Sequence, residues 1–128
     1  MPQGSCAPPR PVVDSALLAA KIAAARDATA RVRAVLPASA DAFIVDRTTR
    51  EVVTLNLFVA IQACLGLAAH WLADAGWDMP GTYADVFAAL AQHAVIPREL
   101  ATRLAAAAAF RNLVAHQYGA LDWRRVYA

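Results

Sequence analysis

Long apolar stretches that are rich in alanine and poor in glycine and proline constrain the fold of this chain more than any other feature. The clearest follows Pro97, where Arg98 and Glu99 open a helix and residues 101–109 are mostly alanine. Alanine is the strongest helix former, and proline fits the first turn of a helix. The chain has only five glycines and few of the apolar-polar alternations that half-buried strands show. We therefore expect an all-α protein.

Capping residues and helix breakers divide residues 13–128 into five expected helices joined by short connections. Their expected ranges are residues 14–36, residues 39 or 41 to 75, a short helix capped by Thr82, residues 97 to about Gly119, and a short helix after Asp122. Long helices with short connections predict an up-down four-helix bundle with a short additional C-terminal helix. A chain of 128 residues holds one domain. Residues 1–12 are proline-rich, lack the apolar core of a signal peptide, and indicate a disordered tail.

An apolar run over residues 57–75 is nearly long enough to cross a bilayer. Gln62, His70 and Asp74 interrupt the run, and the charged residues Arg47, Arg50 and Glu51 belong to the same expected helix. Arg47 and Glu51 are spaced as a surface ion pair. A helix buried by its own bundle and by a partner subunit explains this pattern better than a membrane span. The 59% hydrophobic composition, high for a small monomeric bundle, agrees with burial against a partner subunit.

Charge and cysteine usage narrow the class of protein further. The net charge of +2 is too small for a general nucleic-acid coat, so any RNA contact should be local. Cys6 and Cys64 are not expected to pair, Cys64 being an inert apolar residue, and a reducing cytoplasm fits best. The chain has neither a glycine-rich phosphate loop nor a metal-ligand motif, so we expect no cofactor.

Polar side chains gather at the C-terminal end of the otherwise apolar helix that follows Pro97. With a turn of about 100° per residue, Arg111 shares an apolar stripe with Leu104 and, near the helix end, with Tyr118. A guanidinium in such a stripe needs a partner or an open cleft. Asn112 and His116, four residues apart, lie on the adjoining face. This helix end is the candidate functional site.

The string Phe110-Arg111-Asn112, followed by His116-x-Tyr118, resembles the HEPN superfamily and, within it, the HepT-like toxin family. The family pattern is Arg, four residues, His, one residue, Tyr. The resemblance extends from about residue 42 to the C-terminus and includes residues 56–70 and 82–90. The chain departs from the pattern at Gly66, where many relatives carry an acidic residue, and at its end, where relatives usually continue the last helix.

The resemblance implies a metal-independent endoribonuclease in which Arg111 and His116 act with the help of Asn112. It also implies a homodimer whose two motifs line one cleft, and a minimal nucleotidyltransferase antitoxin that transfers AMP to Tyr118. The side chains support the same chemistry, because imidazole can exchange a proton with a ribose hydroxyl and guanidinium can bind phosphate. Further RNA contacts are expected at nearby basic residues, namely Arg103, Arg124 and Arg125.

Two other classes of protein remain open at this point. A non-catalytic HEPN dimer would bind the nucleotidyltransferase as a scaffold, and a small-ligand-binding bundle would show a closed apolar pocket. His116 alone is more typical of a histidine that interacts with a helix C-terminus. The neighbouring polar residues favour a functional site instead. Trp123 and Tyr127 are interpreted as packing residues.

Overall fold

The computed structural model describes residues 15–128; the expected tail at residues 1–12 and the expected cap Asp14 lie outside this range. The described chain folds into six α-helices and one 3₁₀ helix. These are α1 (Ser15–Val35), α2 (Ala40–Val45), α3 (Arg47–Asp74), α4 (Tyr83–Gln92), α5 (Arg98–His116), the 3₁₀ helix η1 (Tyr118–Ala120) and α6 (Trp123–Tyr127). Residues 15–128 contain no strand, so the all-α prediction is confirmed.

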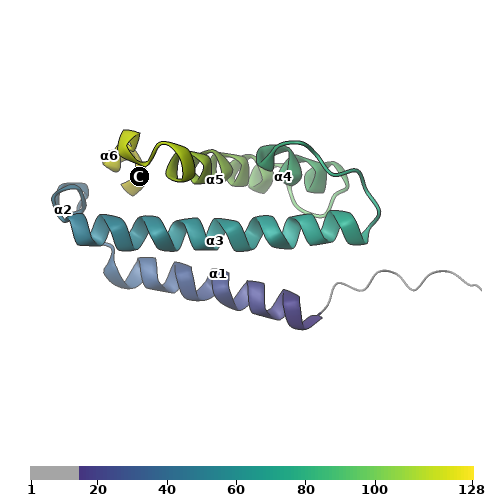
Figure 1. Ribbon diagram of the computed structural model, residues 1–128, viewed down its shortest axis with the longest axis horizontal. Coiled ribbons are helices and arrows are strands. Elements are labelled where there is room, and N and C mark those ends of the chain that lie inside the picture. Colours follow the sequence, from purple (N-terminus) through teal and green to yellow (C-terminus); the bar gives the residue numbers. More distant parts are fainter. Residues whose placement is uncertain (1–14) are drawn as a thin grey trace, which may run out of the picture.

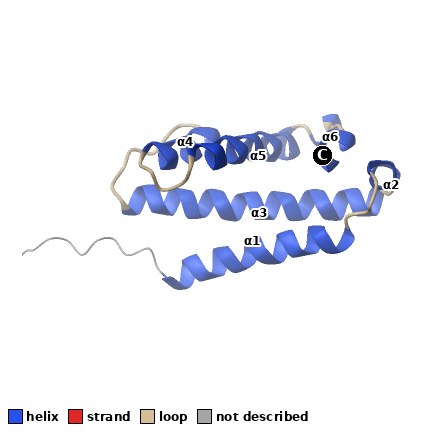
Figure 2. Cartoon of the chain, turned by 180° about the vertical axis from the view of Figure 1, so that it is seen from behind, coloured by secondary structure: helices blue, strands red, loops and turns tan. Residues whose placement is uncertain are grey.

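Helix α3, 28 residues long, lies in the middle of the molecule. Figures 1 and 2 show α1 along one side of it, α4 and α5 along the other, and the short helices α2 and α6 together at one end. The apolar faces of α3, α4 and α5 meet in the main core, whose buried members are Leu65, Ala68, Leu72, Val86, Phe87, Leu90, Ala101 and Ala108. The many alanines let these helices approach closely and leave little volume to fill.

The helix is interrupted at Asp46, between α2 and α3, so the prediction of one continuous helix from residue 39 or 41 to 75 is wrong. Asp46 is extended, with φ −99° and ψ 97°, and it caps α3. Its carboxylate accepts hydrogen bonds from the backbone N–H of Thr49 at 3.1 Å and from the Thr49 hydroxyl at 2.8 Å. An aspartate that caps a new helix in this way competes with continuation of the preceding one.

These cap hydrogen bonds, first the one from the backbone N–H of Thr49, hold the pKa of Asp46 below its ordinary value of 3.8. A carboxyl with a lowered folded-state pKa adds stability above its ordinary pKa and loses it as pH falls through the folded value. Asn caps as well as Asp but does not titrate. We therefore expect the difference in melting temperature between the wild type and Asp46→Asn to shrink as pH falls from about 6 to about 2. An unchanged difference would contradict the ionic contribution of the cap.

The corner between α2 and α3 is filled by aromatic side chains from the C-terminus. Phe43 is fully buried, and its ring packs against Trp123 at 6.4 Å and against Tyr127 at 5.6 Å between centroids. The Tyr127 hydroxyl donates a hydrogen bond to the carbonyl oxygen of Pro37 at 2.8 Å. These contacts confirm Trp123 and Tyr127 as packing residues, and they fix the segment that follows α5.

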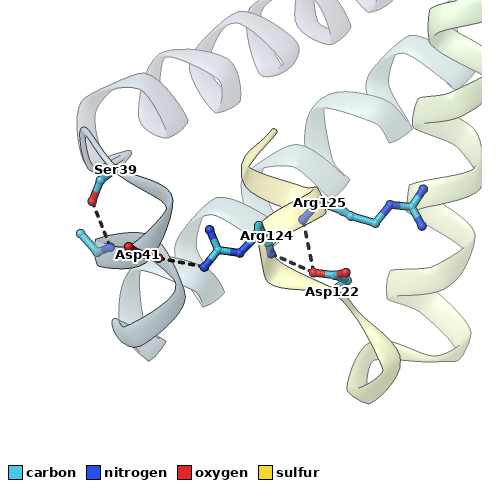
Figure 3. A network of polar contacts seen from close by, with 6 residues as sticks. Ser39, Asp41, Asp122, Arg124 and Arg125 are labelled. Atoms are coloured by element: carbon cyan, nitrogen blue, oxygen red, sulfur yellow. Dashed lines mark hydrogen bonds and ion pairs between the residues drawn. The ribbon is translucent and has the colours of Figure 1, made fainter.

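Polar contacts at the same corner are drawn in Figure 3. Asp122 caps α6 by accepting from the backbone N–H groups of Arg124 at 3.1 Å and Arg125 at 3.4 Å. The Arg124 guanidinium pairs with Asp41 at 2.8 Å. Both side chains of this pair are largely exposed, so the pair adds about 0–1 kcal/mol to stability. The aromatic contacts of Phe43 therefore contribute most to holding α6 on α2.

Helix α4 covers only part of α5. The two run antiparallel, since Ala88, Ala91 and Gln92 line one groove with Ala101 and Ala105. The 10 residues of α4 extend about 15 Å, whereas the 19 residues of α5 extend about 28 Å. Tyr83, the first residue of α4, lies beside Arg111. Residues 112–116 of α5 therefore extend beyond the N-terminal end of α4.

By length and composition, α3 could cross a membrane. In this structure it packs between α1 on one side and α4 and α5 on the other, and 33% of its apolar window is buried. A single apolar helix that contacts the rest of its domain on two sides is weak evidence for a membrane span.

Candidate functional site

The Arg111 side chain reaches from α5 towards α3 and α4 and is half-buried. Its Nε donates a hydrogen bond to Gln62 Oε1 at 2.7 Å, and its Nη1 donates to Asn112 Oδ1 at 3.1 Å. The guanidinium carbon lies 4.7 Å from the ring centroid of Tyr83 and 5.3 Å from that of Phe58, within cation–π distance of both. The prediction that this guanidinium needs a partner is confirmed.

Asn112 and His116 lie exposed on the part of α5 that α4 does not cover. The Asn112 side chain bonds to Arg111. His116 is the last residue of α5, and within residues 15–128 its side chain makes no hydrogen bond or ion pair with another residue. The fold of one chain thus joins Arg111 to Asn112 and leaves the His116 imidazole available to a second molecule.

Helix α5 ends at His116, so the prediction that it continues to about Gly119 is wrong. Gln117 leaves the helix with φ −143° and ψ 49°, while its N–H donates to the Leu113 carbonyl at 2.7 Å. Tyr118 therefore stands in the 3₁₀ helix and not on the stripe predicted for Arg111. Its ring meets Trp123 edge-on, with 5.7 Å between centroids, so the fixed C-terminal segment positions it.

A cavity of about 310 Å³ lies between the N-terminal half of α3 and the end of α5. Its lining residues are Glu51, Thr54, Leu55, Phe58, Val114, Ala115 and Tyr118. Phe58 contacts both this cavity and the Arg111 guanidinium. Phe58 therefore links the Arg111 guanidinium to the cavity that Tyr118 also lines.

An apolar strip on α3 accompanies the polar residues. Leu55 is 62% exposed and Val59, one turn further along, is 39% exposed, while Gln62 continues the exposed face. The exposure of these two apolar side chains shows that no other described helix covers this part of α3. Such a patch is typical of a surface that binds another protein.

The three remaining basic candidates are not gathered around Arg111. Arg124 pairs with Asp41, and Arg125 lines a separate cavity with Phe110 and Leu113; Figure 3 shows its side chain directed away from the Arg124–Asp41 pair. Arg103 is exposed on α5, about 12 Å along the helix axis before Arg111.

Residues that contact Arg111 but were not among the predicted site residues are Gln62, Phe58 and Tyr83. The only sequence signal for Gln62 is that a polar side chain interrupts the apolar run of residues 57–75. Nothing in the sequence near Phe58 or Tyr83 distinguishes these aromatic residues from ordinary core residues.

Gly66, where the chain departs from the family pattern, lies under the side chain of Lys21 from α1. A Cβ built at Gly66 would lie 2.8 Å from Lys21 Nζ. The ammonium group thus occupies the space beside α3 that a side chain at position 66 would enter. A carboxylate at this position would meet a positive charge.

Other reactive chemistry is limited in the described residues. Burial raises the pKa of the Cys64 thiol, which keeps the thiol protonated, as expected of an inert apolar residue. No group of three His, Cys, Asp or Glu residues within residues 15–128 is placed to hold a metal ion.

The sequence matches a known protein family over most of its length. The model of the ribonuclease HepT-like family matches residues 25–128, which include all of α5 and the residues around it. The chain therefore belongs to the HepT-like family of the HEPN superfamily. Comparison with curated protein sequences gave no significant match.

Three solved structures with a similar fold come from toxin–antitoxin systems. A chain from a toxin–antitoxin crystal structure with AMP-PNP has a TM-score of 0.80 and 27% identity, covering 87% of this chain and 83% of that chain. The tri-AMPylated Shewanella oneidensis HEPN toxin in complex with its MNT antitoxin has a TM-score of 0.78 and 28% identity, covering 86% and 82%. A variant MntA–HpeT toxin–antitoxin complex gives 0.78 and 28%, covering 86% and 83%.

Proposed function

We propose that this protein is the cytoplasmic endoribonuclease toxin of a toxin–antitoxin pair. It cleaves RNA at a site made by two copies of the chain and is neutralised by a nucleotidyltransferase that AMPylates Tyr118. The observation that carries this proposal is the arrangement at the end of α5, where a fixed Arg111 guanidinium and an exposed His116 imidazole share the surface left open by α4. Membership of the HepT-like family supports it.

The proposed reaction is internal transesterification. His116 of one copy accepts the proton of a ribose 2′-hydroxyl as the 2′-oxygen attacks the adjacent phosphorus. The bond from phosphorus to the 5′-oxygen breaks, and the second copy's histidine donates a proton to that leaving oxygen. Arg111 stabilises the charge that grows on the phosphate oxygens. The products carry a 2′,3′-cyclic phosphate and a free 5′-hydroxyl, and the chemistry uses no cofactor or metal ion.

A dimer follows from the needs of this reaction and from the surface beside the site. One histidine serves poorly as both base and acid, whereas two copies related by a twofold axis supply two. Leu55 lines the cavity at the end of α5, and Val59, one turn further along α3, is exposed as well. Burying them against the same strip of a second copy would bring the two α5 ends into one cleft.

AMPylation of Tyr118 would inhibit the site directly. The tyrosine is 41% exposed, and it lines the same cavity as Phe58, whose ring lies beside the Arg111 guanidinium. An AMP group on the Tyr118 hydroxyl would place a negative phosphate near the guanidinium, where RNA phosphate has to bind. The AMPylated HEPN toxin among the structural neighbours supports this regulation.

Cleavage by the purified chain in the presence of EDTA tests the activity. We expect fragments with 2′,3′-cyclic phosphate ends, and Arg111→Ala should lower the cleavage rate by about 10²–10³-fold because it removes the charge that meets the phosphate. Arg111→Lys keeps a charge without the planar fork and should retain part of the rate. Full activity in purified Arg111→Ala, or a requirement for added metal, would contradict the proposal. A wild-type chain that binds the antitoxin but never cleaves RNA would favour the non-catalytic scaffold.

A further inference from the structure

The Arg111 guanidinium is held from three helices before any ligand arrives. Gln62 and Phe58 come from α3, Tyr83 begins α4, and Asn112 follows Arg111 on α5. An unrestrained arginine on a helix surface samples many rotamers and loses that freedom when it binds. Here the loss has occurred during folding, so the guanidinium is preorganised.

All four partners of the guanidinium are electrically neutral. Within residues 15–128, Arg111 makes no ion pair with a carboxylate. A half-buried arginine more commonly pairs with a carboxylate, which would cancel its charge. The amide of Gln62 accepts a hydrogen bond, and the rings of Phe58 and Tyr83 attract the cation through their π-electrons. These partners fix the position of the charge and leave it uncompensated.

The hydrogen bonds also select which part of the guanidinium remains available. Nε donates to Gln62 and Nη1 donates to Asn112. Among the described residues, Nη2 has no acceptor. A phosphate oxygen would therefore be met first by the two hydrogens of Nη2.

We infer that Gln62, with Phe58 and Tyr83, is a positioning residue that holds the Arg111 cation in place, uncompensated and with Nη2 free, for the phosphate of the substrate. This inference rests on the proposed function for the identity of the substrate. Gln62 itself does not touch the reacting atoms. It acts through the orientation and the charge of Arg111.

Two substitutions at the exposed Gln62 separate orientation from charge. Gln62→Met keeps the length of the side chain and removes the acceptor, so it should lower kcat/KM for RNA cleavage about tenfold, mainly through kcat. Gln62→Glu keeps the acceptor and adds a counter-charge, so it should preserve the orientation of Arg111 and raise KM about tenfold. Tyr83→Phe keeps the aromatic face and should retain the wild-type kcat/KM. Tyr83→Leu lacks this face and should lower kcat/KM as Gln62→Met does.

Orientation is measured without RNA, by NMR relaxation of the Arg111 ¹⁵Nε–H group in the free protein, assigned with Arg111→Lys. We expect a rigid Nε–H in the wild type and in Gln62→Glu, and a mobile one in Gln62→Met. A rigid Nε–H in Gln62→Met, or unchanged kcat/KM in that variant of a chain that cleaves RNA, would overturn the inference. If the wild type does not cleave RNA at all, the proposed function fails, and the NMR comparison alone decides whether Gln62 holds Arg111.

Discussion

When wild-type protein is mixed with His116→Ala protein and the subunits are allowed to exchange, RNA cleavage is expected to fall as the square of the wild-type fraction. The reason is that the proposed cleft needs a histidine from each copy, so a mixed dimer lacks either the base or the acid. An equal mixture should keep about one quarter of the wild-type activity, because about one quarter of the dimers carry both histidines. The measurement is the initial cleavage rate against the mixing ratio.

The matched controls are the pure His116→Ala dimer and its size. His116 is exposed, and its side chain makes no hydrogen bond or ion pair within residues 15–128, so the variant should remain a dimer by size-exclusion chromatography. Its cleavage rate should fall by about 10³-fold or more, since both the acid and the base are lost. A linear dependence on the wild-type fraction would show that each chain cleaves independently. That result would remove the composite site while leaving the endoribonuclease activity intact.

Tyr118→Phe is expected to escape neutralisation by the nucleotidyltransferase. The substitution removes the hydroxyl that would receive AMP but keeps the ring that packs edge-on against Trp123. Cells that express Tyr118→Phe with the antitoxin should stop growing, whereas cells with the wild-type pair should grow. Intact mass should show AMP added to the wild type and none added to the variant. Cleavage by the modified wild type should fall by about 10²-fold or more, because the added phosphates compete with RNA for Arg111.

Tyr83→Phe is the control for this experiment. Tyr83 is 42% exposed, nearly the same as Tyr118 at 41%, and its ring lies beside Arg111. Its variant should still be modified and neutralised. If Tyr118→Phe is neutralised as well as the wild type and the toxin in the complex carries no AMP, the antitoxin acts by covering the site. The role of Tyr118 would then be limited to packing.

Most of the fold was predictable because its signals are local. Alanine content, the caps Thr82 and Asp122, and the breaker Pro97 each act within one turn of the residue concerned. The break at Asp46 was missed, although an aspartate three residues before the N–H of Thr49 is itself an N-cap pattern. The apolar residues on both sides continue a helical pattern, and no glycine or proline marks the corner. Packing of Phe43 under the distant Trp123 and Tyr127 stabilises it.

The candidate site was predictable in part for the same reason. Arg111 and Asn112 are adjacent in sequence, and the need of a guanidinium for a partner follows from the apolar face on which it stands. The identity of that partner does not follow, because Gln62 is 49 residues away in the chain. Tyr118 was placed by assuming that α5 continues to Gly119. Gln117 ends the helix earlier, and that depends on how the C-terminal segment packs.

Under the proposed function, the shortness of α4 would make activity depend on the concentration of the protein. Because α4 begins beside Arg111 and leaves the end of α5 uncovered, the proposed reaction needs a second copy of the chain to complete the site. At low abundance most copies would be single and harmless, and the reactive fraction would rise steeply once synthesis exceeds the dissociation constant of the pair. Two further turns at the N-terminal end of α4 would cover the exposed end of α5, and activity of such a variant would no longer rise with protein concentration.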